Sequence, residues 1–245
     1  MLYLIGLGLN EKSLGKEAIE EIKKCHHVYL ESYTVEFPYK IETLEKEIGK
    51  KIIKLERKDV EDSSNKLIKE ARKEDIALLV YGSPLFATTH LSLILEAKKQ
   101  KPETKVKIIY NASVFDAIGE TGLELYKFGK ITSLPDWKDK GKTIGFTETI
   151  KQNISINAHT LILVDIGLDF QDALKELEES IKTMEISLKK IIVGSCLGTD
   201  KSKLIYGSIE HLQKQKNIKA PFCFIIPCNT NNLHFTEKEA LENLN

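Results

Sequence analysis

The sequence lacks a charge excess of either sign. Its 245 residues include 36 basic and 36 acidic side chains, so the formal net charge at pH 7 is zero. Composition therefore gives no indication of the basic surface with which nucleic-acid-binding proteins attract phosphates. We expect no nucleic acid among the partners, and we expect any macromolecular partner to be recognised through local patches.

Paired cysteines are also missing. Cys25, Cys196, Cys223 and Cys228 form no C-x-x-C motif, and the closest two of them are separated by a segment that contains Pro227. Zinc sites and redox-active disulfides usually place two cysteines at short spacing. We interpret all four as free thiols at buried positions or strand ends, and we expect no metal site.

No apolar run approaches the roughly 20 residues that cross a bilayer as a helix. The first residues, Met1 to Gly6, have no basic leader and are typical of a first buried strand rather than of a signal peptide. From these two absences we expect a soluble, cytoplasmic protein without a membrane partner.

Alternating strand and helix patterns fill the first half of the sequence. Apolar runs indicate strands, and amphipathic spacing between them indicates helices, so we expect a mainly parallel sheet covered on both faces. The expected strands are 2–7, 27–30, 51–55, 76–81 and 106–110, and the expected helices are 15–24, 41–48, 63–72 and 89–100.

The second half is less regular. The apolar stripe from Phe170 to Met184 predicts a helix with Asp169 as its N-cap. Closely spaced strands favour a mixed sheet, so we predict two α/β domains, residues 1–110 and residues 111–245. The other expected elements are helices at 113–127, 208–215 and 236–244, a polar loop at 135–145, and strands at 160–166, 190–196, 203–206 and 222–226.

Two glycine motifs resemble nucleotide loops without completing them. Gly6-Leu7-Gly8 follows a strand, but Glu11 stands where a dinucleotide fingerprint needs its third glycine. Residues 141–143 read Gly-Lys-Thr, but Asp136 stands where a phosphate-binding loop needs its first glycine. The histidines form no catalytic triad pattern that would indicate hydrolysis.

The segment from Gly82 to His90 is the strongest candidate site. It follows the apolar run 76–81 and precedes a helical pattern, so a buried strand ends in a turn that opens a helix. Ligands of open α/β sheets bind at such turns, where glycine allows close backbone approach. A plain strand-to-helix turn would leave the same pattern.

The letters of that segment, Gly-Ser-Pro-Leu-Phe-Ala-Thr-Thr-His, resemble the GDPxxATTH signature of the diphthine synthase family. Residues 1–9, 28–34, 111–113, 122–130 and 159–161 also resemble that family, so the likeness covers most of residues 1–165 and thins afterwards. It implies the two-domain α/β architecture of tetrapyrrole methylases, with the cofactor in the interdomain cleft, and a homodimer.

The resemblance further implies an S-adenosyl-L-methionine-dependent N-methyltransferase that releases S-adenosyl-L-homocysteine. Its substrate would be translation elongation factor 2, whose 3-amino-3-carboxypropyl histidine is methylated to diphthine in diphthamide biosynthesis. His90 is the implied candidate for a catalytic contact with the acceptor amine. The implied cofactor contacts are Leu9, Ser83, Phe86, Ser113, Val114, Val164, Leu197 and Phe222.

Local roles remain open for several of these residues. Thr88 or Thr89 is typical of a helix N-cap, His90 of a packed helix residue, and Ser113 of a capping serine. The chain departs from the family where Ser83 replaces the aspartate of GDP, and also within residues 194–198.

Two other functions remain possible. One is a methylase of the same fold that acts on a corrinoid or ribosomal RNA, and the other is a non-catalytic module that binds elongation factor 2. The number of methyl groups, methylation of a carboxylate and the catalytic base are not determined by the sequence.

Overall fold

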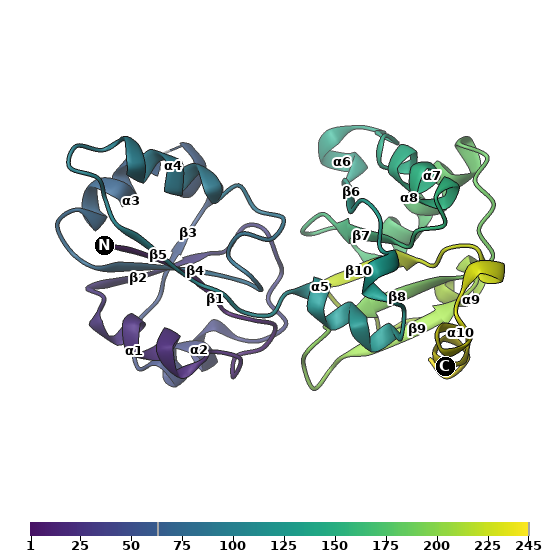
Figure 1. Cartoon of the computed structure of the whole chain (residues 1–245), viewed down its shortest axis with the longest axis horizontal. Helices are drawn as coiled ribbons and strands as arrows, with labels where there is room; N and C mark the ends of the chain where they lie inside the picture. Colours follow the sequence, from purple (N-terminus) through teal and green to yellow (C-terminus); the bar gives the residue numbers. More distant parts are fainter. Residues whose placement is uncertain (63, 245) are drawn as a thin grey trace. The chain divides into compact units, whose positions relative to one another are not determined.

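A computed structural model describes residues 1–62 and 64–244 (Figure 1). The chain divides into two compact units, Met1–Asp116 and Ala117–Asn245. Residues 111–116, which we expected to open the second domain, therefore group with the first unit. Ser63, the first residue of one expected helix, lies outside the described residues.

The first unit is built on a five-stranded sheet in the order β3-β2-β4-β1-β5. Every neighbouring pair in it is parallel, which confirms the predicted parallel sheet. The strands are β1 (Leu2–Gly6), β2 (His27–Glu31), β3 (Ile53–Leu55), β4 (Ile76–Val80) and β5 (Val106–Ile109).

Helices cover both faces of this sheet (Figure 1). The central strands β1 and β4 are buried along their whole length, because their alternate side chains enter two separate cores. Ile5 packs in one core with residues of α1 and α2, and Leu4 packs in the other with residues of α3 and α4. The helices are α1 (Lys16–Lys24), α2 (Ile41–Ile48), α3 (Ser64–Ala71) and α4 (Leu91–Lys99), with a π-helical turn at Lys58–Asp62.

The second unit contains a five-stranded mixed sheet in the order β6-β7-β10-β8-β9. Only β6 and β7 are parallel, and the other neighbours are antiparallel, as the sequence predicts. The strands are β6 (Thr132–Leu134), β7 (Thr160–Val164), β8 (Ile191–Ser195), β9 (Lys203–Gly207) and β10 (Phe222–Ile226).

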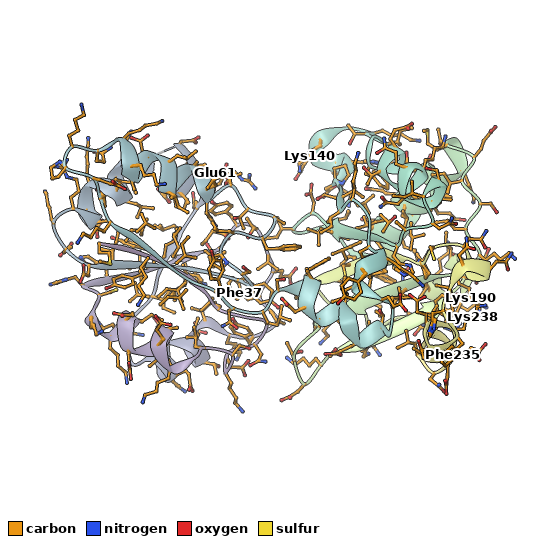
Figure 2. The ribbon with its side chains drawn as sticks, viewed as in Figure 1. Phe37, Glu61, Lys140, Lys190, Phe235 and Lys238 are labelled. Carbon is orange, nitrogen blue, oxygen red and sulfur yellow. The ribbon has the colours of Figure 1, made fainter. Side chains whose placement is uncertain are left out.

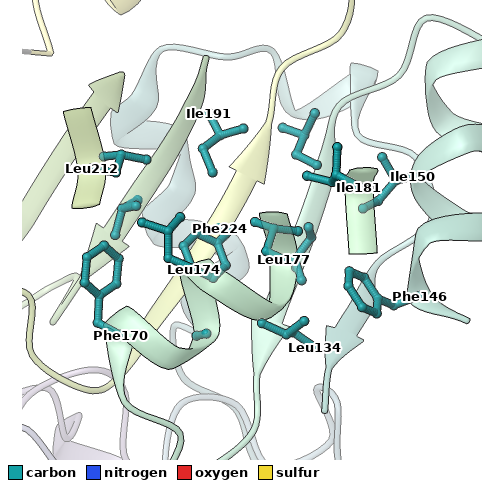
Figure 3. Close-up of a cluster of buried hydrophobic side chains, with 14 of the residues drawn as sticks. Leu134, Phe146, Ile150, Phe170, Leu174, Leu177, Ile181, Ile191, Leu212 and Phe224 are labelled. Carbon is teal, nitrogen blue, oxygen red and sulfur yellow. The ribbon is translucent and has the colours of Figure 1, made fainter. Parts of the chain in front are cut away.

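Helix α8 (Phe170–Thr183) supplies much of the core of this second unit (Figure 3). Its apolar stripe packs against the sheet, where Phe224 is completely buried. The Asp169 side chain accepts a hydrogen bond from the backbone N–H of Gln171, which confirms the predicted N-cap.

The prediction of one continuous helix over residues 113–127 is wrong. Helix α5 (Val114–Ala117) continues as a 3₁₀ turn, η2 (Ile118–Thr121), and ends at Gly122, whose φ is 74°. A Cβ atom on Gly122 would lie 2.2 Å from the Cβ atom of Ala240, so glycine is required there. After this left-handed residue the chain forms a separate turn, η3 (Leu125–Lys127).

Residues 135–145 also differ from the loop that we expected. They contain a short helix, α6 (Trp137–Lys140), because the Asp136 side chain caps the backbone N–H of Lys138. Helix α7 (Phe146–Ser155) was not predicted, since its sequence is mostly polar between Phe146 and Ile150. The remaining elements are α9 (Ile209–Gln213), η4 (Thr230–Asn232) and α10 (Phe235–Glu242).

The four cysteines are free and buried, which confirms their interpretation as unpaired thiols. Burial raises the pKa of Cys25 to about 11 and that of Cys223 to about 12, so both thiols stay protonated at neutral pH. Within residues 1–62 and 64–244, no helix combines the length and the apolar character needed to cross a membrane.

Candidate functional site

Three neighbouring strands of the first unit, β4, β1 and β5, end at one edge of the parallel sheet. The turns after β1 and β4 are fastened to each other at Gly8 and Gly82. The N–H of Gly8 donates to the Gly82 carbonyl over 3.1 Å, and the N–H of Gly82 donates to the Gly8 carbonyl over 3.0 Å. Both residues have a φ of 71°, a conformation that favours glycine. The two turns therefore form a single backbone platform.

The last residue of β1, Gly6, has no room for a side chain. A Cβ atom on Gly6 would lie 2.6 Å from the Gly82 carbonyl oxygen and 2.9 Å from Cδ of Pro84. The turn after β5 joins the same assembly through Asn111. Its Nδ2 donates to the Gly6 carbonyl over 3.1 Å and to the Ser13 carbonyl over 2.9 Å. Close packing around Gly6 and the side-chain amide of Asn111 thus hold the turns after β1, β4 and β5 together.

The predicted cofactor residues of the first unit lie on these turns or, for Val114, at the start of the helix that follows. Leu9 is buried, and its carbonyl accepts a hydrogen bond from the Tyr81 hydroxyl over 3.0 Å. Ser83 and Phe86 are partly exposed in the turn after β4, and Phe86 stacks on Phe115 with ring centroids 5.8 Å apart. The five positions brought to this edge are Leu9, Ser83, Phe86, Ser113 and Val114.

Ser113 performs the local role that the sequence left open. Its Oγ accepts from the Phe115 N–H over 3.2 Å and donates to Oδ2 of Asp116 over 3.0 Å. The same carboxylate oxygen accepts the Ser113 N–H over 2.6 Å. This reciprocal arrangement caps the start of α5. A contact between Ser113 and a cofactor stays a prediction.

His90 is almost completely buried, with 1 % of its surface exposed. Its Nδ1 lies 3.1 Å from the Pro84 carbonyl, which can only accept, so this nitrogen carries the proton. The Thr88 hydroxyl donates to the same carbonyl over 3.1 Å. The arrangement favours a positioning role for His90 in the Gly82–His90 turn. Its Nε2 is buried and has no hydrogen-bond partner among the described residues, and a contact between His90 and an acceptor stays a prediction.

The predicted site residues of the second unit lie at one end of its sheet. Val164 ends β7, Phe222 begins β10 and Leu197 follows β8. Antiparallel pairing brings them to the same end, because Phe222 is opposite Ser195 and Cys223 is opposite Leu163. These three residues therefore belong together within their own unit.

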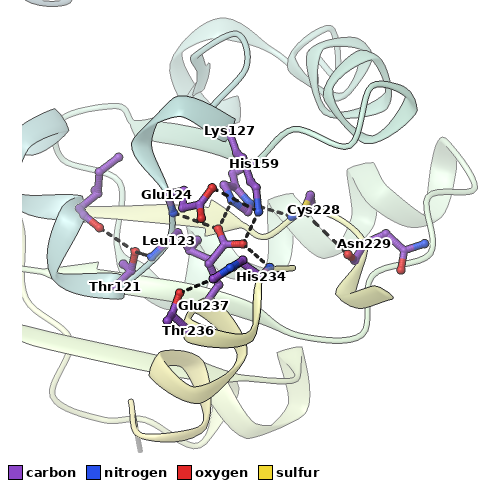
Figure 4. A network of polar contacts seen from close by, with 11 residues as sticks. Thr121, Leu123, Glu124, Lys127, His159, Cys228, Asn229, His234, Thr236 and Glu237 are labelled. Atoms are coloured by element: carbon purple, nitrogen blue, oxygen red, sulfur yellow. Dashed lines mark hydrogen bonds and ion pairs between the residues drawn. The ribbon is translucent and has the colours of Figure 1, made fainter. Parts of the chain in front are cut away.

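A second polar assembly, which the sequence did not indicate, surrounds Glu237 on α10 (Figure 4). Its fully buried carboxylate accepts the N–H groups of Glu124 and His234, over 2.9 and 2.7 Å, and the Lys127 ammonium over 2.5 Å. Burial alone would raise the pKa of Glu237. The hydrogen bonds from Lys127, Glu124 and His234 outweigh burial and lower that pKa to about 2.

His159 completes this assembly as a neutral imidazole. Its Nδ1 accepts the backbone N–H of Cys228 over 2.9 Å, so its proton is on Nε2, which donates to Glu237 over 3.0 Å. Burial lowers the pKa of His159 despite the neighbouring carboxylate. The network connects η3, the end of β10 and the C-terminal helix.

One group among the described residues has an arrangement suited to a metal. Nε2 of His27 lies 4.0 Å from a carboxylate oxygen of Glu70 and 3.6 Å from one of Glu74. The group lies on the surface, and the Tyr29 hydroxyl already donates to Glu70 over 2.8 Å. Since Glu70 already has a hydrogen-bond partner and His27 is exposed, these contacts do not by themselves indicate a metal site.

Comparison with known proteins identifies the class to which this fold and these turns belong. Residues 1–213 match the family model of the tetrapyrrole (corrin/porphyrin) methylases, so the chain belongs to that methylase family. It is also similar to the diphthine synthase of Methanocaldococcus jannaschii, with 39% identity over 100% of this chain and 98% of that protein.

Other relatives carry a related name but are longer. The chain is 44% identical to the diphthine methyl ester synthase of Schizosaccharomyces pombe over 70% of its own length and 60% of that protein. A crystal structure of diphthine synthase superimposes with a TM-score of 0.89 at 31% identity, covering 100% of this chain and 96% of that one. These findings confirm the resemblance, the fold and the methyltransferase class that the motifs predicted.

Proposed function

We propose that this protein is a diphthine synthase of the cytoplasm. It methylates the amino nitrogen of the 3-amino-3-carboxypropyl histidine on translation elongation factor 2, in diphthamide biosynthesis, and it acts as a homodimer. The observation that supports this most strongly is the 39% identity with the diphthine synthase of Methanocaldococcus jannaschii over 98% of that protein's length.

The edge of the first sheet fits S-adenosyl-L-methionine by its chemistry. Phe86 and Val114 offer partly exposed apolar side chains for a flat purine, and the turns that contain the glycines and the buried Leu9 bring backbone groups close to a ligand. Ser83 offers a neutral hydroxyl where the family signature has a carboxylate. We also propose three cofactor contacts from the second unit, namely Val164, Leu197 and Phe222.

The cofactor supplies an activated methyl group, so the protein's own contribution is mainly positioning. The acceptor amine must be neutral to attack, and it loses one proton for each methyl group it gains. Burial and the fixed turns around Gly8 and Gly82 hold the reacting groups in place and reduce the entropy lost at the transition state. His90 fixes the Pro84 carbonyl within this platform.

Mass spectrometry of elongation factor 2 tests the proposal directly. The factor is prepared with the unmethylated intermediate side chain and incubated with the protein and S-adenosyl-L-methionine. We expect the modified peptide to gain the mass of one or more methyl groups, and base treatment distinguishes an ester from an ammonium product. Intact cofactor binding without any methyl gain would contradict the proposal and favour a corrinoid or RNA substrate, or a binding module without catalysis.

A further inference from the structure

A cavity of about 380 Å³ lies within the second unit. Its walls include Lys190, which directly precedes β8, Tyr206 near the end of β9, and the segment 227–229 that follows β10. Val164, Leu197 and Phe222 lie at the opposite ends of these antiparallel strands and their neighbour β7. The cavity is therefore separated by the length of the sheet from the predicted cofactor residues of this unit.

The charged side chains that line this cavity are all basic. Lys189 and Lys190 both line it, and no acidic residue does. Among residues 1–62 and 64–244, neither lysine lies within ion-pair distance of a carboxylate. The Lys190 ammonium lies 5.1 Å from the centroid of the Tyr206 ring, which holds it by a cation–π contact (Figure 2 labels Lys190). Two uncompensated positive charges in a concave surface attract an anion.

The wall formed after β10 is held in place before any ligand arrives. The N–H of Cys228 donates to the buried His159, which is in turn fixed by Glu237 (Figure 4). The Asn229 side chain accepts the N–H of Asn231 over 3.1 Å, and both asparagines line the cavity. Preorganised polar groups bind a ligand with a smaller loss of conformational entropy.

Apolar and polar surfaces meet in the same cavity. Ile154, Leu188 and Pro227 line it together with the lysines and asparagines. The volume falls within the range of about 300–1,000 Å³ that is usual for small-molecule pockets. A bare inorganic anion would satisfy the charge and leave the apolar part without a partner.

We propose that this cavity is a binding site for a small phosphomonoester of nucleotide size. Its phosphate contacts Lys189 and Lys190, and its neutral part lies against Leu188 and Pro227. The assignment rests on the second unit alone and is independent of the proposed methyl transfer.

Calorimetric titration of the whole protein tests this site with uridine 5′-monophosphate, uridine and inorganic phosphate as probes. The uridine probe is chosen because it lacks the adenine ring of the methyl donor. The test variant is Lys189→Ala/Lys190→Ala. The control, Lys175→Ala/Lys216→Ala, removes the same charge from exposed positions of the same unit that do not line the cavity. Thermal unfolding shows whether each variant is folded.

We expect one molecule of uridine 5′-monophosphate to bind per chain, at least tenfold more tightly than uridine or phosphate. The test variant should weaken binding at least tenfold and the control less than twofold. Absence of saturable binding by the wild-type protein, equal losses in both variants, or equal affinity for uridine would overturn the proposal. Phosphate binding as tight as that of the nucleotide would overturn the assigned ligand size.

Discussion

The two units organise their strand ends in different ways. In the first unit all strands are parallel, so the turns after β4, β1 and β5 meet at one edge and are joined by backbone groups of Gly8 and Gly82. In the second unit most neighbours are antiparallel, and the segment after β10 is held by the neutral imidazole of His159, which donates to the buried Glu237 carboxylate paired with Lys127. The first arrangement leaves no room for added atoms around Gly6, and the second depends on the buried charge of Glu237.

This difference has a physical cause. Parallel strands direct their carboxyl ends to the same edge, which creates a place where backbone can approach a ligand closely. A mixed sheet spreads its turns over both ends, so a buried turn needs side-chain partners for its backbone N–H groups. Added volume should therefore damage the first unit, and removed charge should damage the second.

The largest expected effect comes from Glu237→Ala. It leaves Lys127, His159 and two backbone N–H groups without their buried acceptor, so we expect the free energy of unfolding to fall by about 3 kcal/mol or more. Urea denaturation measures this value. Glu239→Ala, at an exposed position of the same helix, should cost less than about 0.5 kcal/mol. Similar losses for both variants would show that the network around Glu237 contributes no more to the free energy of unfolding than an exposed glutamate does.

The second effect concerns space at the end of β1. In Gly6→Ala the new Cβ atom meets the Gly82 carbonyl and Pro84, so we expect a loss of about 1–3 kcal/mol in the free energy of unfolding. Because the turns must separate, affinity for S-adenosyl-L-methionine should fall more than tenfold in calorimetry. Gly15→Ala is the matched control, since nothing lies within 4 Å of its added Cβ atom. Unchanged affinity in Gly6→Ala would show that cofactor binding does not depend on how these turns pack.

The third effect is a pH dependence confined to the second unit. The pKa of His159 is lowered in the folded state, so its contribution to stability is complete above its ordinary pKa of 6.5 and is lost as the pH falls below it. Glu237, with a pKa lowered from 4.5 to about 2, loses its contribution only below pH 4.5. His159→Gln should therefore flatten the stability profile just below pH 6.5.

Urea midpoints measured at closely spaced pH values test this order. The wild-type protein should begin to lose stability below pH 6.5, and both proteins should lose it below pH 4.5. A variant profile parallel to that of the wild type throughout would show that His159 does not titrate with unfolding.

The smallest effect is expected for Ser83→Asp, which restores the carboxylate of the family signature. Ser83 is partly exposed, so the longer side chain can be accommodated, and a charged acceptor forms stronger hydrogen bonds than a hydroxyl. We expect affinity for S-adenosyl-L-methionine to stay the same or rise in calorimetry. A tenfold loss would show that the turn has adapted to serine.

The sequence predicted the fold well where local pattern and burial coincide. The bounds Ile41–Ile48 and Phe222–Ile226 agree with the structure because each element has a clear apolar face or run. The helix over 113–127 was wrong because its end depends on Gly122 packing against Ala240, which no local pattern reveals.

The candidate site shows the same limit. The Gly82–His90 turn stands out in the sequence, but the Asn111 amide that joins it to β1 contacts Gly6, 105 positions earlier. Glu237 was missed for the same reason, since its partner Glu124 is 113 positions away. Contacts between distant residues decide these roles, and a single sequence does not show them.

Amide hydrogen exchange of the whole protein, with and without S-adenosyl-L-homocysteine, tests most directly whether the first unit's turns bind the cofactor. We predict slower exchange on ligand addition at residues 7–9, 81–86 and 111–114, because the ligand covers the platform joined at Gly8 and Gly82. Unchanged exchange at all three turns, with protection confined to residues 187–190 and 227–231, would contradict this assignment.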